Sequence, residues 1–298
     1  MKILLFGTTG QVGQECLALF NKQGWEVISI ERKDVDFRMP SSVYESVLFN
    51  KPDIVVNACA YTAVDKAESE SELAGLVNAE SVELMAKACS ELDIPIVHIS
   101  TDYVFNGLAS SPYCEDDEVD PQGVYGRTKL EGEKLLTSEC PKSLIIRTSW
   151  VFSAHGNNFV KTMIRLGKER DELGVVGDQF GCPTFAGDIS QVIADVISLI
   201  EQAPNFDGWG TYHCSDAGVV SWNDFAQKIF RQAVELKLLS KAPKVNSITT
   251  NQYPTPATRP AYSVLNCNKL EALLGRPMPH WKLGLQHVCE TLLEQTRA

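Results

Sequence analysis

The chain opens with Lys2-Ile3-Leu4-Leu5-Phe6-Gly7-Thr8-Thr9-Gly10-Gln11-Val12-Gly13, an apolar run that ends in a glycine-rich turn. Apolar residues then recur at helical spacing, at Val12, Cys16, Leu19 and Phe20,. The stretch therefore predicts a strand, a tight turn and a helix. Glycine at positions 7, 10 and 13 allows the backbone to approach a diphosphate while the first amides of the helix point toward it,.

An ordinary turn between a strand and a helix would explain the same glycines without any ligand. The strand before the turn and the helix after it favour the dinucleotide-binding interpretation. The spacing is Gly-x-x-Gly-x-x-Gly, which differs from the commoner Gly-x-Gly-x-x-Gly. We therefore predict that the turn from Gly7 through Gly10 to Gly13 holds the diphosphate of a dinucleotide cofactor.

Strands and helices alternate through the first half of the chain. Further apolar runs lie at residues 26–30, 54–56, 94–99 and 144–146, with helical patterns between them. This rhythm is typical of right-handed βαβ units, so we predict an α/β fold with a Rossmann-type doubly wound parallel sheet. We assign residues 1–155 to a dinucleotide-binding domain. Residues 156–298 are assigned mainly to a smaller C-terminal α/β substrate lobe, with some later segments returning to the first domain.

Helical patterns also appear outside the opening unit. Ser42 to Glu45 resembles a capping box, which predicts a helix that starts there and continues through Val47 and Leu48,. A long, partly interrupted helix is predicted to end near Cys89. In the second half, amphipathic helices are predicted at residues 187–200, 221–236 and 281–293,.

Ligands of such sheets bind at the carboxyl ends of the strands. That edge would carry residues 58–60, the stretch Ser100-Thr101-Asp102, and Trp150. A hydroxyl after the fourth strand can hydrogen-bond a substrate oxygen, although Ser/Thr/Asp turns are also common at strand ends. Trp150 has two interpretations, a stacking surface for a ring or an ordinary core residue.

The end of the second strand bears on the choice of cofactor. Glu31 stands where a carboxylate accepts hydrogen bonds from the adenosine ribose, which favours NADH,. Arg32 and Lys33 follow at once, and basic residues tolerate the additional phosphate of NADPH. The sequence therefore keeps NADPH and NADH as alternatives, and a plain solvated loop would explain all three residues equally.

The stretch Tyr125-Gly126-Arg127-Thr128-Lys129 places a phenol and an ammonium four residues apart, on one face of a helix,. A nearby positive charge stabilises a phenolate, so we predict that Lys129 lowers the pKa of Tyr125 and that Tyr125 is a general acid for carbonyl reduction. The alternative is an exposed helix face that carries Arg127, Lys129, Glu131, Glu133 and Lys134. The motif gains weight because the glycine turn predicts the same chemistry independently.

Arg259 lies in a loop stiffened by prolines, Tyr253-Pro254-Thr255-Pro256-Ala257-Thr258-Arg259-Pro260. A guanidinium held there can clamp a phosphate through two hydrogen bonds. A purely structural role is equally consistent with a single arginine.

The 298 residues carry a net charge of −11 and no run of Lys or Arg, so we expect neither nucleic acid nor an anionic membrane as a partner,. The opening apolar run is too short for a signal peptide or a membrane anchor, which predicts a cytoplasmic protein. Nine cysteines show no Cys-x-x-Cys spacing and are expected to be reduced thiols,. The five histidines show no metal-ligand spacing, so we predict no histidine-based metal site,.

The glycine turn, the Ser100-Thr101-Asp102 strand end and Tyr125-x-x-x-Lys129 resemble the extended short-chain dehydrogenase/reductase superfamily. Nearly end to end, the chain resembles the dTDP-4-dehydrorhamnose reductase family within it. The narrower resemblance rests on Leu4-Leu5-Phe6-Gly7, Gln11-Val12-Gly13, Val56-Asn57-Ala58, Thr62-Ala63-Val64-Asp65-Lys66-Ala67-Glu68, Ser100-Thr101-Asp102-Tyr103-Val104-Phe105, Arg147-Thr148-Ser149-Trp150-Val151, Gly156-Asn157-Asn158-Phe159, Asp178-Gln179 and Tyr253-Pro254-Thr255-Pro256. It implies reduction of the C4 ketone of dTDP-4-dehydro-L-rhamnose to dTDP-L-rhamnose by NADPH or NADH.

The resemblance also implies roles for individual residues. Thr101, Tyr125 and Lys129 match the catalytic residues of the family, with Lys129 also holding the nicotinamide ribose. Val64, Asp102 and Trp150 match positions that touch the dTDP-sugar. The positions that match cofactor contacts are Gly10, Gln11, Val12, Glu31, Asp36, Phe37, Ala60, Tyr61 and Thr62.

Some members of the family dimerise around Mg²⁺ held by three glutamates, and only Glu15 matches that set here. The other two positions align with Gly187 and Thr291, with Asp188 and Glu290 adjacent. We therefore expect no metal-bridged dimer, and a monomer or a weak homodimer instead.

Two other functions remain open. A reductase or epimerase acting on another nucleotide sugar would need the same fold and the same three residues. A non-catalytic, NADP-binding regulatory subunit of this fold would keep the cofactor site. Such subunits can lose the catalytic residues, whereas this chain retains Tyr125 and Lys129.

Overall fold

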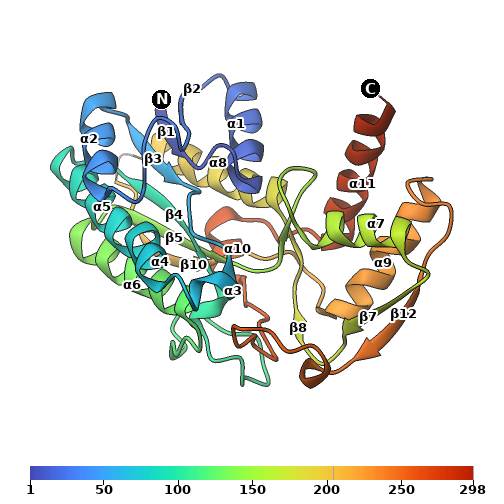
Figure 1. The fold of residues 1–298 in the computed structure, drawn as a ribbon. Helices are drawn as coiled ribbons and strands as arrows, with labels where there is room; N and C mark the ends of the chain where they lie inside the picture. The colour runs from blue at the N-terminus through green and yellow to red at the C-terminus, as the bar shows by residue number, and fades with distance from the viewer. Residues whose placement is uncertain (204, 298) are drawn as a thin grey trace.

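The computed structural model describes residues 1–203 and 205–297 (Figure 1). A six-stranded sheet forms its centre, with strand order β10-β5-β4-β3-β1-β2 and parallel neighbours throughout. The strands are β1 (Lys2–Phe6), β2 (Glu26–Ile30), β3 (Ile54–Asn57), β4 (Ile96–Thr101), β5 (Ser143–Thr148) and β10 (Gly210–His213). The strand order reverses between β1 and β3, and this architecture confirms the predicted doubly wound α/β class.

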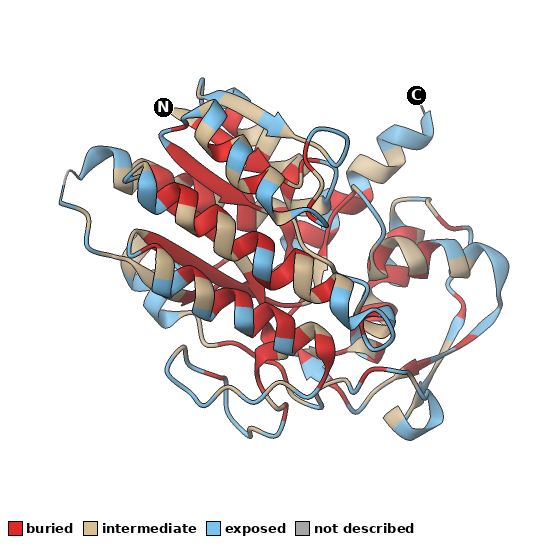
Figure 2. Ribbon diagram, turned by 60° about the vertical axis from the view of Figure 1, so that its left-hand side comes forward, coloured by how far each residue is buried: buried red, intermediate tan, exposed pale blue. Residues whose placement is uncertain are grey.

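Helices cover both faces of this sheet. On one face α1 (Gln11–Lys22) packs beside α8 (Ala186–Gln202), and on the other lie α2 (Pro40–Asn50), α5 (Ser81–Glu91) and α6 (Val124–Glu139). Because successive strand residues point to opposite faces, Ile3 and Leu5 join the first core while Leu4 and Phe6 join the second,. A strand buried on both faces must be apolar throughout, which explains the opening run (Figure 2),.

The second half of the chain contributes to this sheet before it builds a core of its own. The edge strand β10 pairs with β5, and α8 and α10 (Asn268–Leu274) pack into the core on the α1 face. The separate core of the second lobe lies among α7 (Phe159–Glu169), α9 (Trp222–Glu235), α11 (Trp281–Arg297) and the parallel pair β7 (Glu172–Val176) and β12 (Lys244–Ile248). The domain boundary at residue 155 stays a prediction.

Short elements connect these layers. The long, interrupted helix consists of α4 (Ser71–Gly75), the π-helical turn η1 (Leu76–Glu80) and α5. Among the described helices, none has the length and hydropathy needed to span a bilayer. The remaining elements are α3 (Val64–Ala67), η2 (Asp102–Val104), β6 (Val151–Phe152), β8 (Phe180–Gly181), β9 (Thr184–Phe185), β11 (Val220–Ser221) and η3 (Thr250–Gln252).

The predicted capping box is wrong. Helix α2 begins at Pro40, so residues 42–45 lie inside its first turns. Proline suits the first helical position because its missing N–H would have no partner there. The Ser42 hydroxyl donates to the carbonyl oxygens of Asp36 and Met39, at 3.0 and 2.8 Å, and so does not cap an N-terminus.

Helix α6 approaches its neighbours through two glycines. A Cβ atom on Gly132 would lie 2.0 Å from the carbonyl oxygen of Asn78 in η1, and one on Gly126 would lie 2.2 Å from the carbonyl oxygen of Tyr103. Both distances are far below van der Waals contact. The glycines therefore set how closely α6, with Tyr125 and Lys129, sits against the edge of the sheet.

We expect Gly132→Ala to lower the free energy of unfolding by about 1–3 kcal/mol, because the added methyl group forces α6 away from η1. Urea unfolding followed by circular dichroism measures the change. Gly75→Ala is the matched control, since Gly75 is helical and has open space around its Cβ position. This control should be neutral or stabilising by up to ~1 kcal/mol; equal losses in both variants would contradict the packing argument.

Candidate active site

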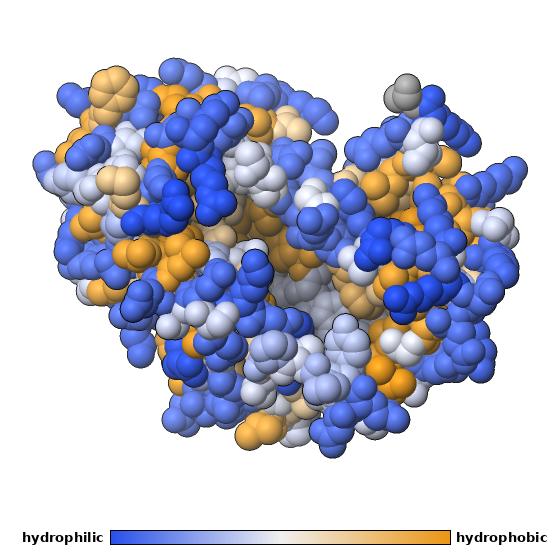
Figure 3. All heavy atoms as spheres, in the orientation of Figure 1, coloured by the Kyte–Doolittle hydropathy of each residue, from blue (hydrophilic) through white to orange (hydrophobic). Residues whose placement is uncertain are grey.

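A cavity of about 480 Å³ opens at the carboxyl ends of β1, β3, β4 and β5. It lies in the hollow between the sheet and the second lobe (Figure 3). This is also where the strand order reverses, the usual ligand position in open α/β sheets. The predicted residues that line it are Gly10, Gln11, Val12, Ala60, Thr62, Val64, Thr101, Asp102, Tyr125, Lys129 and Trp150.

A second cavity of about 230 Å³ adjoins the first one, because Cys59 and Ala60 line both. The other predicted cofactor residues lie here: Gly7, Glu31, Asp36, Phe37 and Tyr61. Two adjoining cavities joined at the glycine turn have the extended form that a dinucleotide needs, with one end for each nucleoside. The residues present therefore fit the group that the sequence predicts.

The glycines of the turn divide into packing and ligand positions. Gly7 has φ +84°, and a Cβ on it would lie 2.6 Å from the backbone of Ala58. A Cβ on Gly13 would lie 2.1 Å from the carbonyl oxygen of Gly7. Gly10 instead faces the first cavity, immediately before the N-terminus of α1. The N-terminal amides of this helix thus point at the site where a diphosphate would lie.

The second cavity carries charges of both signs. Lys33 pairs with Glu31 at 2.9 Å, and Arg38 pairs with Asp36 at 2.7 Å. The hydrogen bonds from Arg38 lower the pKa of Asp36 to about 2. Since Arg32 and Arg38 line the cavity beside Glu31 and Asp36, this end offers acceptors for ribose hydroxyls and cations for an additional phosphate.

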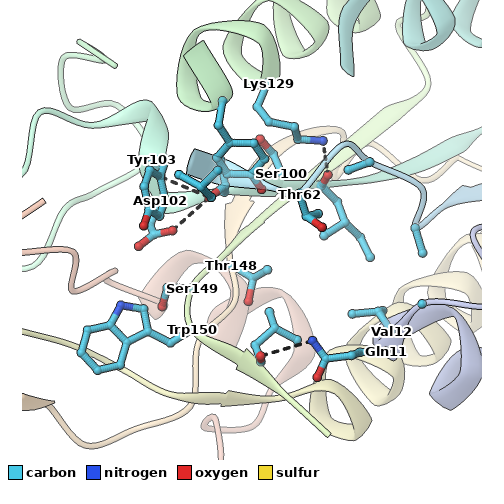
Figure 4. A pocket seen from close by; sticks show the side chains of 18 of the residues that line it. Gln11, Val12, Thr62, Ser100, Asp102, Tyr103, Lys129, Thr148, Ser149 and Trp150 are labelled. Atoms are coloured by element: carbon cyan, nitrogen blue, oxygen red, sulfur yellow. Dashed lines mark hydrogen bonds between the residues drawn. The ribbon is translucent and has the colours of Figure 1, made fainter. Parts of the chain in front are cut away.

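Tyr125 and Lys129 both come from α6 and line the first cavity. Figure 4 shows Lys129 among the residues that line it. Arg127, Glu131 and Lys134 do form an exposed charged face, but the alternative is wrong for Lys129, which is only 1% exposed, and for Glu133, which is buried too. Glu133 accepts hydrogen bonds from Arg147 of β5 at 2.7 Å, which ties α6 to the sheet. Burial of a paired charge of this kind requires good geometry, and the bidentate contact supplies it,.

The predicted effect of Lys129 on Tyr125 is wrong for this structure. Burial raises the pKa of Tyr125 above its usual value, and only the interaction with the Thr101 hydroxyl opposes this shift. The amine of Lys129 instead donates to the carbonyl oxygen of Ile99 at 2.7 Å and lies 3.0 Å from His98 Nε2. Burial lowers the pKa of Lys129 to about 8, with Glu133 and Cys59 acting in the opposite direction.

Thr101 ends β4 and caps the short helix η2. Its hydroxyl donates to Asp102 Oδ1 at 3.0 Å and accepts from the Tyr103 amide at 3.2 Å. The turn interpretation therefore describes part of its role. Thr101 still lines the cavity, and its hydroxyl is near enough to Tyr125 to lower the pKa of the phenol.

Three buried side-chain atoms at the cavity wall have no hydrogen-bond partner among the described residues: Ser100 Oγ, Asp102 Oδ2 and Thr148 Oγ1. Buried polar atoms normally have partners, so these three are available to a polar ligand. Sequence reasoning missed Thr148 as a site residue. The signal for it is the register of β4 and β5, which places Thr148 directly beside Thr101.

Trp150 combines both of its interpretations. Its ring lines the cavity and stacks on Trp222 from the second lobe, with centroids 3.5 Å apart and planes within 7°. The backbone of Trp150 has φ +48°, an uncommon value for a residue with a side chain,. The stacked pair therefore forms a rigid aromatic wall between the lobes.

The structure does not bring Arg259 to the wall of either cavity. Its guanidinium pairs with Asp65, directly after the start of α3, at 2.8 Å. The predicted phosphate clamp is thus replaced here by a contact between the proline-rich loop and the sheet domain. That contact supports the structural interpretation of this arginine.

The described residues contain no group of three or more histidine, cysteine, aspartate or glutamate side chains arranged to hold a metal ion. Glu15 accepts a hydrogen bond from Ser153 at 3.1 Å and lies 3.9 Å from His155 Nε2. Asp188 shares a hydrogen bond with Asp216, and the charge of Glu15 also acts on it.

The model of the RmlD substrate binding domain family matches residues 1–294. The chain is 46% identical to the dTDP-4-dehydrorhamnose reductase of Escherichia coli K12 and 44% identical to that of Salmonella typhimurium, over 99% of each chain in both pairs. The chain belongs to the dTDP-4-dehydrorhamnose reductase family. The family resemblance predicted from the motifs is thereby confirmed.

Solved structures of the dTDP-4-dehydrorhamnose reductase family have the same architecture. The protein from Clostridium acetobutylicum superimposes with a TM-score of 0.90 at 42% identity, covering 98% of this chain and 99% of its own. The protein from Bacillus anthracis, in complex with NADP, gives 0.89 at 36% identity, covering 97% and 99%. UDP-glucose 4-epimerase from Thermus thermophilus, at 19% identity and a TM-score of 0.77, shares the fold.

Asp102 gives a pH-dependent test of the cavity wall. Burial raises its pKa to about 6 from the usual 3.8, so ionisation above that pH destabilises the folded state,. We expect Asp102→Asn to raise the free energy of unfolding by roughly 2–3 kcal/mol at pH 8, an upper estimate. The gain should shrink below pH 6 and vanish below pH 4, where both states are protonated. Urea unfolding across pH measures it; a gain independent of pH would contradict the burial argument.

Proposed function

We propose that this chain catalyses the NADPH-dependent reduction of the C4 ketone of dTDP-4-dehydro-L-rhamnose to dTDP-L-rhamnose. The observation that supports it most is one cavity that joins the glycine turn to Thr101, Tyr125 and Lys129. The reductase family supplies the reaction, and the Bacillus anthracis relative supplies the choice of NADP. Arg32 and Arg38 suit the additional phosphate, with NADH as the alternative cofactor.

The proposed cofactor site runs along both cavities. Gly10, Gln11 and Val12 hold the diphosphate at the N-terminus of α1, while Gly7 and Gly13 permit the close backbone packing that shapes this turn,. The adenosine end contacts residues of the second cavity, which are Glu31, Asp36, Phe37, Ala60 and Tyr61, with Thr62 toward the first. When bound, the dinucleotide supplies the hydride for the ketone.

Tyr125 is the proposed general acid. The phenol is protonated at neutral pH, which is the form that a proton donor needs, but burial raises its pKa and so makes the proton harder to give up,. Thr101 orients the ketone oxygen while the Tyr125 hydroxyl gives its proton to the developing alkoxide. Lys129, as an ammonium, offsets the negative charge that this transfer leaves on the phenol and holds the nicotinamide ribose.

The dTDP-sugar occupies the remaining part of the first cavity in this proposal. Val64 and Asp102 line it, and the free Oδ2 of Asp102 accepts a hydrogen bond from a sugar hydroxyl. Trp150, braced by Trp222, offers a flat apolar surface,. Reductases for other nucleotide sugars would use the same acid, so a panel of nucleotide keto-sugars assayed for NADPH oxidation decides the substrate.

We expect Tyr125→Phe to lower kcat for NADPH oxidation with the keto-sugar by about 10²–10⁴-fold, because the proton donor is lost. NADPH binding, measured by fluorescence titration, should change little. Tyr44→Phe is the matched control, because its hydroxyl contacts Glu91 on the outside of the sheet domain. The control should keep its turnover within twofold of the parent, a change of below ~0.5 kcal/mol. Full turnover by Tyr125→Phe would refute the proposed mechanism.

We propose further that the chain is a monomer or a weak homodimer without a bridging metal. Gly187 and Thr291 stand where the family's other two glutamates would be, and Glu15 contacts Ser153 and His155. Adding EDTA should therefore leave the mass from light scattering unchanged. A chelator-dependent shift from dimer to monomer, reversed by Mg²⁺, would show that a metal bridges two copies after all.

A further inference from the structure

A buried row of three polar side chains runs behind the cavity. Asn57 ends β3, His98 lies in β4, and Lys129 reaches them from α6; none is more than 1% exposed. Asn57 and His98 are register partners of the parallel pair, so both side chains leave the sheet on the same face,. Asn57 Nδ2 lies 3.0 Å from His98 Nδ1, and His98 Nε2 lies 3.0 Å from Lys129 Nζ.

The amide of Asn57 fixes the proton on the imidazole. The backbone N–H of Cys59 can only donate, so the Asn57 atom that it contacts at 3.0 Å is the oxygen,. The NH₂ group of Asn57 therefore faces His98 Nδ1, which must accept. Burial lowers the pKa of His98 well below 6.5, so the ring is neutral and its single proton lies on Nε2,.

The protonation state of Lys129 follows from these contacts. An ammonium has donors only, whereas a neutral amine has one lone pair. Lys129 Nζ already donates to the carbonyl oxygen of Ile99 at 2.7 Å, and His98 presents an N–H to it. The neutral amine can donate to Ile99 and accept the N–H of His98 through its lone pair. An ammonium could make only the first of these two hydrogen bonds.

Glu133 and Cys59 favour the charged form of Lys129, but their influence is smaller than that of burial. Glu133 on α6 is engaged by Arg147 of β5, and the Cys59 thiol after β3 is kept neutral because burial raises its pKa to about 11. Tyr125, one turn before Lys129 on α6, is protonated for the same reason. Burial remains the largest influence on Lys129, whose pKa lies at about 8.

We propose that Asn57 and His98 are positioning residues that favour the neutral amine of Lys129 until the dinucleotide binds. This inference rests on the proposed function, because it assigns the role of Lys129 to the same site. Gly10 at the start of α1 and Lys129 line the same cavity, so the negative diphosphate of a dinucleotide bound there would stabilise a positive charge on the amine,. Cofactor binding above neutral pH therefore takes up a proton from solvent, and the row converts Lys129 into the charged form that the reduction needs.

The test is the pH dependence of NADPH binding to the free enzyme, which needs no turnover. With proton uptake by Lys129, the Kd of the parent chain should rise about tenfold between pH 7 and pH 9. Titration calorimetry in buffers of different ionisation enthalpy should show net proton uptake near pH 8.5. A Kd that stays constant across this range overturns the proposal.

Two variants, at His98 and at Asn57, remove the imidazole N–H that faces Lys129. In His98→Gln the amide oxygen can accept from the ammonium, and in Asn57→Ser the imidazole can carry its proton on Nδ1 and accept through Nε2. Both should raise the pKa of Lys129, so Kd should rise less than about threefold from pH 7 to pH 9. Lys129→Met, as a control, should abolish proton uptake. A tenfold rise in both His98→Gln and Asn57→Ser overturns the proposal.

The tautomer of His98 can also be read directly in the parent protein by long-range ¹⁵N–¹H NMR, whether or not the buried variants fold. A proton on Nε2 supports the proposal, and a proton on Nδ1 overturns it. The proposed function is separable from this result. A chain that binds NADPH with the expected pH dependence but reduces no dTDP-keto-sugar would refute the function and leave the role of the row intact.

Discussion

The close backbone contact between the first turn and the end of β3 governs the site. Gly7 meets Ala58, and Gly13 meets the carbonyl oxygen of Gly7, with no room for a single methyl group at either place. This contact brings the N-terminus of α1 to the edge where the strand order reverses. Gly126 and Gly132 do the same for α6, so glycine contacts position both the anion-binding amides and the proposed acid.

Burial then determines the chemistry of the groups that these contacts bring together. Burial of Tyr125 makes its phenol a weaker acid, and burial of Lys129 makes its ammonium a stronger one,. A lysine beside a tyrosine in sequence was expected to act on the phenol directly. In the structure the amine instead contacts Ile99 and His98 of β4. Its surroundings are therefore set by the sheet, without any ligand.

Sequence patterns predicted the sheet because its strands are buried on both faces and read as unbroken apolar runs,. They also predicted that Gly10, Thr101, Tyr125 and Lys129 belong to one site, and the structure has all four lining one cavity. The positions of Asn57, His98 and Thr148 beside the cavity were not predictable in this way. Their neighbours are far apart in the sequence, and the register of β3, β4 and β5 supplies the missing information. Likewise, nothing local to Arg259 indicates that Asp65 will neutralise it.

The central sheet includes β10, which is synthesised long after the other five strands. During translation the first 155 residues emerge with β5 as an open edge, and its backbone groups stay unpaired until residues 210–213 leave the ribosome,. The sheet face that α1 covers likewise stays partly uncovered until α8 has been synthesised. The central sheet is therefore incomplete until more than two thirds of the polypeptide has been made, and until then the edge of β5 can pair with strands of other chains,.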